Sequence, residues 1–239
     1  TAESLDGVHF PPQACLRFKD LVKNYSVTLP ERSVAYYNCL TVSRTPARIL
    51  EEMKTVAGRA LEMTLTHLSK ARQTLRERGA SLPEKKAFPP RVLSYGDLLE
   101  KVRSRTERFD DVLESFLKTL PDSMDERDLC IETASFLLDL SGEKGPLILV
   151  GFLPPFYPPR LNRSESAGER ALLRAVERLK EAGKPYGLSI SRIDVFQGIM
   201  DLSYLGFQGA PSELDALAEN MPLWGRGYRF PLNELKKLD

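Results

Sequence analysis

The most regular pattern in the chain is a repeat of apolar positions at helical spacing between residues 45 and 77. Thr45 and Pro46 supply a helix N-cap and a proline at the first helical position, where its missing N–H costs nothing. Gly79 marks the end. We expect one helix of roughly 30 residues, about 45 Å long at 1.5 Å per residue. Its apolar stripe is Ile49, Leu50, Met53, Val56, Ala57, Ala60, Leu61, Leu65, Leu68 and Leu75.

The sequence before this helix favours extended structure. Residues 8–18 mix apolar and polar positions around a Pro-Pro pair, which suits an extended edge segment. Residues 34–42, VAYYNCLTV, are rich in β-branched and aromatic side chains and predict a strand. After the helix, residues 81–90 carry three prolines and no period, which is typical of a linker.

The second half of the chain alternates helical and strand patterns. Its apolar run at 146–153, PLILVGFL, predicts a central strand, and strand 188–196 would follow helix 166–182 to complete a βαβ unit. The other expected helices span 96–120, the stretch from a Ser123–Glu126 capping box to Ser141-Gly142, and 212–219.

These patterns predict a mixed α/β protein. We divide it into residues 1–80, 81–95 and 96–239: a half-domain of a strand with a long helix, a linker, and an α/β portion containing the βαβ unit. At 239 residues the chain is long enough for one large domain or two small ones.

Composition narrows the function classes. The hydrophobic share of 42% and the charged share of 28% are those of a globular protein, and a net charge of +1 disfavours nucleic acid or anionic membranes as partners. The apolar runs are far shorter than the roughly 20 residues of a membrane span. Three widely spaced cysteines fit a reducing compartment, so we expect a cytoplasmic protein.

Few residues suggest catalysis directly. The two histidines, His9 and His67, lie far apart, and neither an HExxH nor an HxD motif is present, so we expect structural roles for both and assign no metal ligand. A GxSxG elbow and phosphate-binding glycine loops are also missing. We therefore assign no catalytic residue.

Two loops after predicted strands differ from ordinary connections. The first, Pro154–Pro159, carries Phe156 and Tyr157; it would line a ligand crevice at the carboxyl end of the strand or serve as a rigid surface connection. The second, Gly198–Tyr204, places three polar groups within four residues. They would face the same crevice or act only as helix caps. These candidates for contact with substrate are Asp201, Ser203 and Tyr204.

Three segments in this order resemble one known family: KDLVKNYSVTLPE with the strand and helix start up to Met53, FLPPFYPPRL, and GIMDLSYLG. The family is the di-zinc metallopeptidase family twenty, which includes aminoacylases, acetylornithine deacetylases and glutamate carboxypeptidases. Val27 and Pro30 match the turn of its lid domain. The chain is most similar to the arginine-utilisation branch, and the resemblance supports a position for Asp201 and Ser203 beside the active site.

The chain departs from the family at the lid strand. Ser26 replaces the usual asparagine of the turn, and Asn38 and Leu40 stand where the strand usually has an acid and an arginine, so no substrate-carboxylate role is carried over. The resemblance implies two zinc ions in a complete protein. Their ligands would come from polypeptide before Thr1 and just beyond Asp239, and this chain alone would be inactive.

Three hypotheses of function follow. In the first, the chain is the lid and part of the catalytic domain of a zinc-dependent amidohydrolase or peptidase acting on peptides or N-acyl amino acids. In the second, it is a non-catalytic module that forms a homodimer through the lid-like segment. In the third, it is an α/β protein that binds a small metabolite near Phe156, Tyr157 and Asp201.

Overall fold

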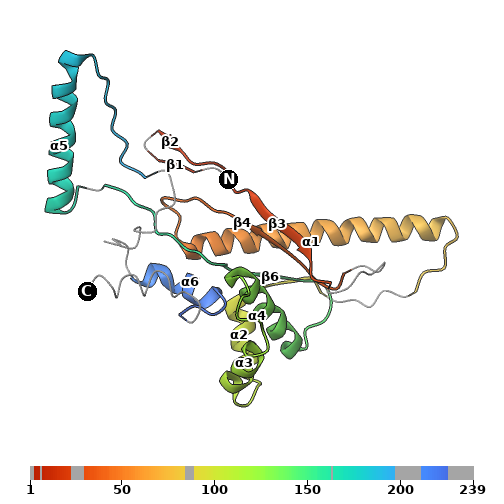
Figure 1. Ribbon diagram of the computed structural model, residues 1–239. Helices are drawn as coiled ribbons and strands as arrows, with labels where there is room; N and C mark the ends of the chain where they lie inside the picture. The colour runs from red at the N-terminus through yellow and green to blue at the C-terminus, as the bar shows by residue number, and fades with distance from the viewer. Residues whose placement is uncertain are drawn as a thin grey trace. The chain divides into compact units, whose positions relative to one another are not determined.

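A computed structural model describes residues 3–5, 7–22, 30–83, 89–162, 164–196 and 211–225 (Figure 1). None of the helices among these residues combines the length and the hydrophobicity that a membrane span requires. The strands are β1 (Ser4–Leu5), β2 (Val8–His9), β3 (Cys15–Asp20), β4 (Ser33–Tyr37), β5 (Arg91–Ser94) and β6 (Leu147–Val150). The helices are α1 (Pro46–Glu77), α2 (Tyr95–Arg103), α3 (Phe109–Leu117), α4 (Glu126–Ser141), α5 (Ala167–Gly183) and α6 (Asp215–Asn220), with short 3-10 helices η1 (Lys184–Tyr186) and η3 (Pro211–Leu214).

The chain forms two compact units, each built from two separate stretches. Unit 1 combines Thr1–Arg44 with Phe156–Gln208, and unit 2 combines Thr45–Pro155 with Gly209–Asp239. The mixed α/β class expected from the sequence is confirmed. The units follow contacts within the chain, whereas the division into residues 1–80, 81–95 and 96–239 rests on pattern and resemblance and stays a prediction.

Helix α1 in unit 2 has the predicted start and length. The Thr45 side chain accepts a hydrogen bond from the Arg48 N–H, Pro46 occupies the first turn, and the helix runs to Glu77 over 32 residues. Leu50 and Leu61 are buried, and α1 contacts β5, β6 and α6. Beyond Leu61 most side chains of the helix are exposed.

Strands β5 and β6 form a parallel pair with α2, α3 and α4 between them in sequence. The core of unit 2 lies against this pair and centres on Leu98 and Leu137, which are fully buried. Phe116 of α3 stacks on Phe136 of α4 with ring centroids 4.0 Å apart. The other buried members of this core are Tyr95, Val102, Phe109 and Leu113.

The parallel β-α-β arrangement is therefore present, but its strands differ from those expected. Residues 188–196 do not form a strand; their single bridge joins Val195 to Leu161. The partner of β6 is β5, which lies inside the predicted linker. A strand needs a neighbour as well as β-branched residues, and 188–193 have no strand beside them among the described residues.

Two helix predictions also need correction. The helix expected over 96–120 divides into α2 and α3, because Arg108 adopts a left-handed conformation (φ 51°) just before Phe109. Helix α4 is capped by Asp125, whose carboxylate accepts from the Arg127 N–H at 2.9 Å, and not by a Ser123–Glu126 box. A turn after Pro121 shifts the helix start. The predicted stop at Gly142 is confirmed.

Unit 1 contains two small antiparallel pairs, β1–β2 and β3–β4, and helix α5. The predicted strand 34–42 is present as β4, which ends at Tyr37. A small core brings together Phe10, Val42 and Val195 from distant parts of the sequence. Helix α5 starts with a capping box between Ser166 and Glu169.

Candidate functional site

The carboxyl edge of the β5–β6 pair is where an α/β sheet usually presents its ligand crevice. In this chain Asn220, 4% exposed, fills the edge. The Asn220 side-chain oxygen accepts from the Gly96 N–H at 3.0 Å, and its backbone oxygen accepts from the Phe152 N–H at 2.8 Å. The last residue of α6 therefore satisfies backbone groups at the start of α2 and just after β6.

Two glycines make this approach possible. A Cβ atom on Gly151 would lie 2.8 Å from the Asn220 backbone oxygen, and one on Gly96 would lie 3.1 Å from the Asn220 side-chain oxygen. Real Cβ atoms essentially never come as close as the first distance. The close packing identifies this edge as a structural junction and not an open crevice.

Beside this junction lie two buried groups that ionise only at high pH. Burial, followed by the nearby charges of Glu126 and Asp125, raises the pKa of the Cys130 thiol to about 12. The thiol donates to the Pro222 carbonyl oxygen at 3.2 Å. Burial also raises the pKa of the Tyr95 hydroxyl. Cys130 stays protonated at neutral pH, and a protonated, buried thiol is a poor nucleophile.

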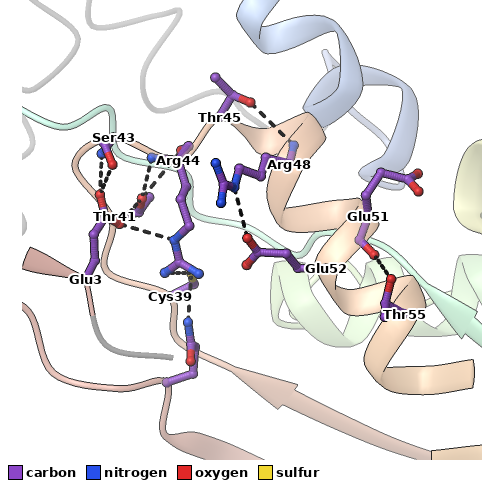
Figure 2. A network of polar contacts seen from close by, with 11 residues as sticks. Glu3, Cys39, Thr41, Ser43, Arg44, Thr45, Arg48, Glu51, Glu52 and Thr55 are labelled. Carbon is purple, nitrogen blue, oxygen red and sulfur yellow. Dashed lines mark hydrogen bonds and ion pairs between the residues drawn. The ribbon is translucent and has the colours of Figure 1, made fainter. Parts of the chain in front are cut away.

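Among the described residues of unit 1, the densest polar network surrounds Glu3 (Figure 2). The Glu3 carboxylate accepts from the Thr41 hydroxyl at 2.7 Å, the Val42 N–H at 3.2 Å, and both the N–H and the hydroxyl of Ser43 at 2.5 Å. Arg44 Nε pairs with the same carboxylate at 3.2 Å. These contacts fasten the first strand segment to the turn that precedes α1.

Two opposing effects set the pKa of Glu3. Burial of its side chain, which is 8% exposed, raises the pKa. Hydrogen bonds from Ser43, Thr41 and the backbone outweigh burial and lower the pKa from 4.5 to about 2. Every one of these partners stabilises the ionised form of Glu3 and holds a chain segment in place. The network therefore has a structural role.

The Arg44 guanidinium also donates to the Cys39 sulfur at 3.7 Å (Figure 2). The Gln13 amide donates to the same sulfur at 3.7 Å. Cys39 is half-buried. Both of these groups donate to the sulfur and neither can accept the thiol proton, so these contacts do not make Cys39 part of a nucleophile–base pair.

The sequence-predicted site residues are only partly within the described chain. Phe156 and Tyr157 follow β6 in an extended connection, and both are half-buried; the flanking Pro154 and Pro158 are buried. Asp201, Ser203 and Tyr204 lie outside the described residues. The expected convergence of the two loops therefore stays a prediction.

The described residues do not fit a metal ion. They contain no group of three or more His, Cys, Asp or Glu side chains arranged to hold one. His9 on β2 hydrogen-bonds through Nδ1 to the Ser4 hydroxyl at 2.7 Å, and His67 is exposed on α1. Since a zinc site takes at least three protein ligands, we assign no metal ligation to these histidines.

No family profile and no solved structure matches the chain significantly. Two curated proteins of Bacillus subtilis (strain 168) do match. The uncharacterized protein YqjN is 28% identical over 96% of this chain and 41% of its own length. Protein RocB is 25% identical over the whole chain and 42% of its own length. The chain is thus distantly similar to both along all or nearly all of its length, and spans about two-fifths of theirs.

Sequence reasoning missed two of the polar residues that organise the structure. Asn220 sits at the end of a predicted short helix, and nothing in the local pattern signals that its side chain reaches Gly96. Glu3 lies in a polar opening segment where an acidic residue is unremarkable. Its role follows only from the Ser43 and Thr41 contacts, which are distant in sequence.

Proposed function

We propose that this chain forms the lid and part of the catalytic domain of a zinc-dependent amidohydrolase or peptidase that acts on peptides or N-acyl amino acids. The observation that carries the proposal is the match to YqjN and Protein RocB along at least 96% of the chain, at about two-fifths of their length. The ordered landmarks that resemble metallopeptidase family twenty, and its arginine-utilisation branch in particular, point to the same class.

Within this proposal the chain contributes substrate contacts and not metal ligands. The described residues offer no metal site, so zinc would be held by residues outside them. Asp201, Ser203, Tyr204, Phe156 and Tyr157 are the proposed substrate-facing residues.

Metal content and hydrolysis test the proposal together. The complete gene product and this chain are each loaded with zinc, desalted and measured by mass spectrometry, and both are assayed on a panel of dipeptides and N-acyl amino acids. We expect about two zinc ions and hydrolysis only for the complete product, as in two-metal sites. A complete product that binds zinc but hydrolyses none of the panel would overturn the activity.

A matched pair of variants tests the substrate-facing role. Asp201→Asn in the complete product should reduce kcat/KM by at least about tenfold, which corresponds to the loss of one hydrogen bond to substrate. Asp215→Asn changes an exposed carboxylate at the start of α6 and should leave kcat/KM unchanged. Equal effects of the two substitutions would remove Asp201 from the site.

A second proposal is that residues 1–80 form a homodimer interface. Within each unit this segment exposes large apolar side chains: Phe18 on β3 of unit 1 is 75% exposed, and Val56 and Met63, seven residues apart on α1 of unit 2, are 65% and 73% exposed. Monomeric proteins rarely leave extended apolar patches in water. Light scattering over a range of concentrations should show a dimer, and Met63→Glu should weaken it; a monomer at all concentrations would exclude this interface.

A further inference from the structure

The segment after η1 has the sequence of a strand but lacks a partner. Residues 188–193, LSISRI, are all exposed, and Leu188 and Ile193 have exposed fractions of 59% and 56%. Residues 189–193 make no backbone hydrogen bond to other described residues. Exposed apolar side chains beside unpaired N–H and C=O groups form a template for another strand.

Helix α5 presents an uncovered apolar face in the same unit. Leu172 and Leu179 lie two turns apart on one face, with exposed fractions of 60% and 61%. Arg174 and Arg178 lie on the opposite face and are exposed as well. An amphipathic helix gains its stability by burying its apolar stripe, and the described residues do not bury this one.

The uncovered face and the unpaired segment lie together. The chain reverses at Gly187 (φ 69°) and turns back from the end of α5 (Figure 1). A Cβ atom on Gly183 would lie 3.4 Å from the Ile190 side chain, so that side chain touches the last turn of α5. The Arg192 Nη1 atom lies 3.6 Å from the Glu177 Oε1 atom of α5. The segment therefore contacts α5 at Gly183, one turn beyond Leu179, and at Glu177.

We propose that α5 and residues 187–196 form a docking surface for a β-sheet carried by polypeptide outside this chain. The sheet adds a strand beside residues 188–193, and its apolar layer covers Leu172 and Leu179. Strand addition supplies main-chain hydrogen bonds, and the helix face supplies apolar contact. A sheet is the partner that meets both requirements at once.

The occupant is the polypeptide that corresponds to the unmatched part of YqjN and Protein RocB. Those relatives carry more than half of their length outside the match. This inference rests on the proposed function insofar as the chain works within a larger polypeptide, but it does not depend on zinc or on hydrolysis.

Hydrogen–deuterium exchange tests the docking surface. It is measured on this chain and on the complete gene product, both stripped of metal with a chelator. We expect the amides of residues 189–193 to exchange at the rate of an unstructured peptide in this chain and at least about 100-fold more slowly in the complete product. Fast exchange in both samples would overturn the proposal, and concentration-dependent protection in this chain would assign the surface to a second copy instead.

Variants on the two faces of α5 sharpen the test. Leu172→Asp with Leu179→Asp should raise exchange at residues 189–193 of the complete product by at least about tenfold, whereas Arg174→Ala with Arg178→Ala should leave it unchanged. Equal effects would show that the apolar face is not the docking face. Exchange is measured without metal, whereas hydrolysis is assayed on the zinc-loaded product. Residues 189–193 can therefore be protected even if the zinc-loaded product hydrolyses nothing, so this inference and the proposed function can fail separately.

Discussion

The network around Glu3 predicts how unit 1 responds to acid. The perturbation is Glu3→Gln, which keeps the shape of the side chain and one acceptor oxygen but removes the charge that pairs with Arg44. The low pKa of Glu3 means that its ionised form is stabilised in the folded state. A pKa lowered from 4.5 to about 2 corresponds to about 3 kcal/mol of stability at neutral pH.

The sign of the pH effect follows from the direction of this pKa change. The stabilisation is complete above the unfolded pKa of about 4.5 and is lost as the pH falls through that value towards the folded pKa of about 2. The wild-type protein should therefore lose stability in unit 1 between these pH values. Glu3→Gln has no carboxyl group to titrate at this position and should lack this part of the acid response.

Local protection against hydrogen exchange measures both effects. At pH 6 the amides of residues 7–10 and 41–44 should be less protected in Glu3→Gln by about 2 kcal/mol, or roughly 30-fold, the scale of hydrogen bonds to a charged group. The difference should shrink as the pH approaches 3. Glu181→Gln changes an exposed carboxylate on α5 and serves as the control. The same pH profile in Glu3→Gln and the wild type would refute the reasoning.

Three further predictions concern unit 2. Leu98→Ala empties a fully buried position and should lower the free energy of unfolding by about 3 kcal/mol in urea titrations. Gly151→Ala should destabilise the fold because its Cβ meets a backbone oxygen at 2.8 Å, whereas Gly58→Ala on α1 has open space and should stabilise it by about 0.5–1 kcal/mol in the same assay. At pH 8, iodoacetamide should label the exposed Cys15 within minutes. It should label Cys130, whose pKa burial raises to about 12, only after denaturant is added. Peptide mapping measures both, and early labelling of Cys130 would show that its burial is incomplete.

The structural features that could be predicted from the sequence are those that depend on residues close together in the chain. The limits of α1 follow from Thr45, Pro46 and an apolar repeat, all of which act within one or two turns. Residues 188–196 show the limit of this reasoning. Their β-branched pattern is real, but a strand forms only beside another strand, and that partner is not a local property.

Strand β5 is the reverse case, because it is a strand inside a segment that the sequence pattern predicts to be a linker. Four residues, Arg91–Ser94, carry too little pattern to distinguish them from a linker, yet they pair with β6 because α2, α3 and α4 carry the chain back to them. The tie is strengthened by Glu143, whose side chain is 6% exposed and pairs with Arg91 of β5 and Lys101 of α2. Such long-range contacts are invisible in a window of sequence.

The same reason limited the candidate site. The sequence predicts Phe156 and Tyr157 as site residues because prolines frame an aromatic pair after a recognisable strand, and Asp201 because polar groups follow another strand-like run; both assignments stay predictions. The closure of the β5–β6 edge by Asn220 could not be found, because it depends on a Gly96 contact 124 residues away in sequence.

The late position of Asn220 in the sequence determines when the edge of the β5–β6 pair can close during synthesis. Gly96 and Phe152 leave the ribosome with backbone N–H groups whose acceptor has not yet been synthesised. At about 5–20 residues per second, the roughly 70 residues between β6 and Asn220 take roughly 4–14 s to translate. During that interval the two N–H groups at the edge of the parallel pair lack their native acceptor, and the edge closes only once the end of α6 has been synthesised.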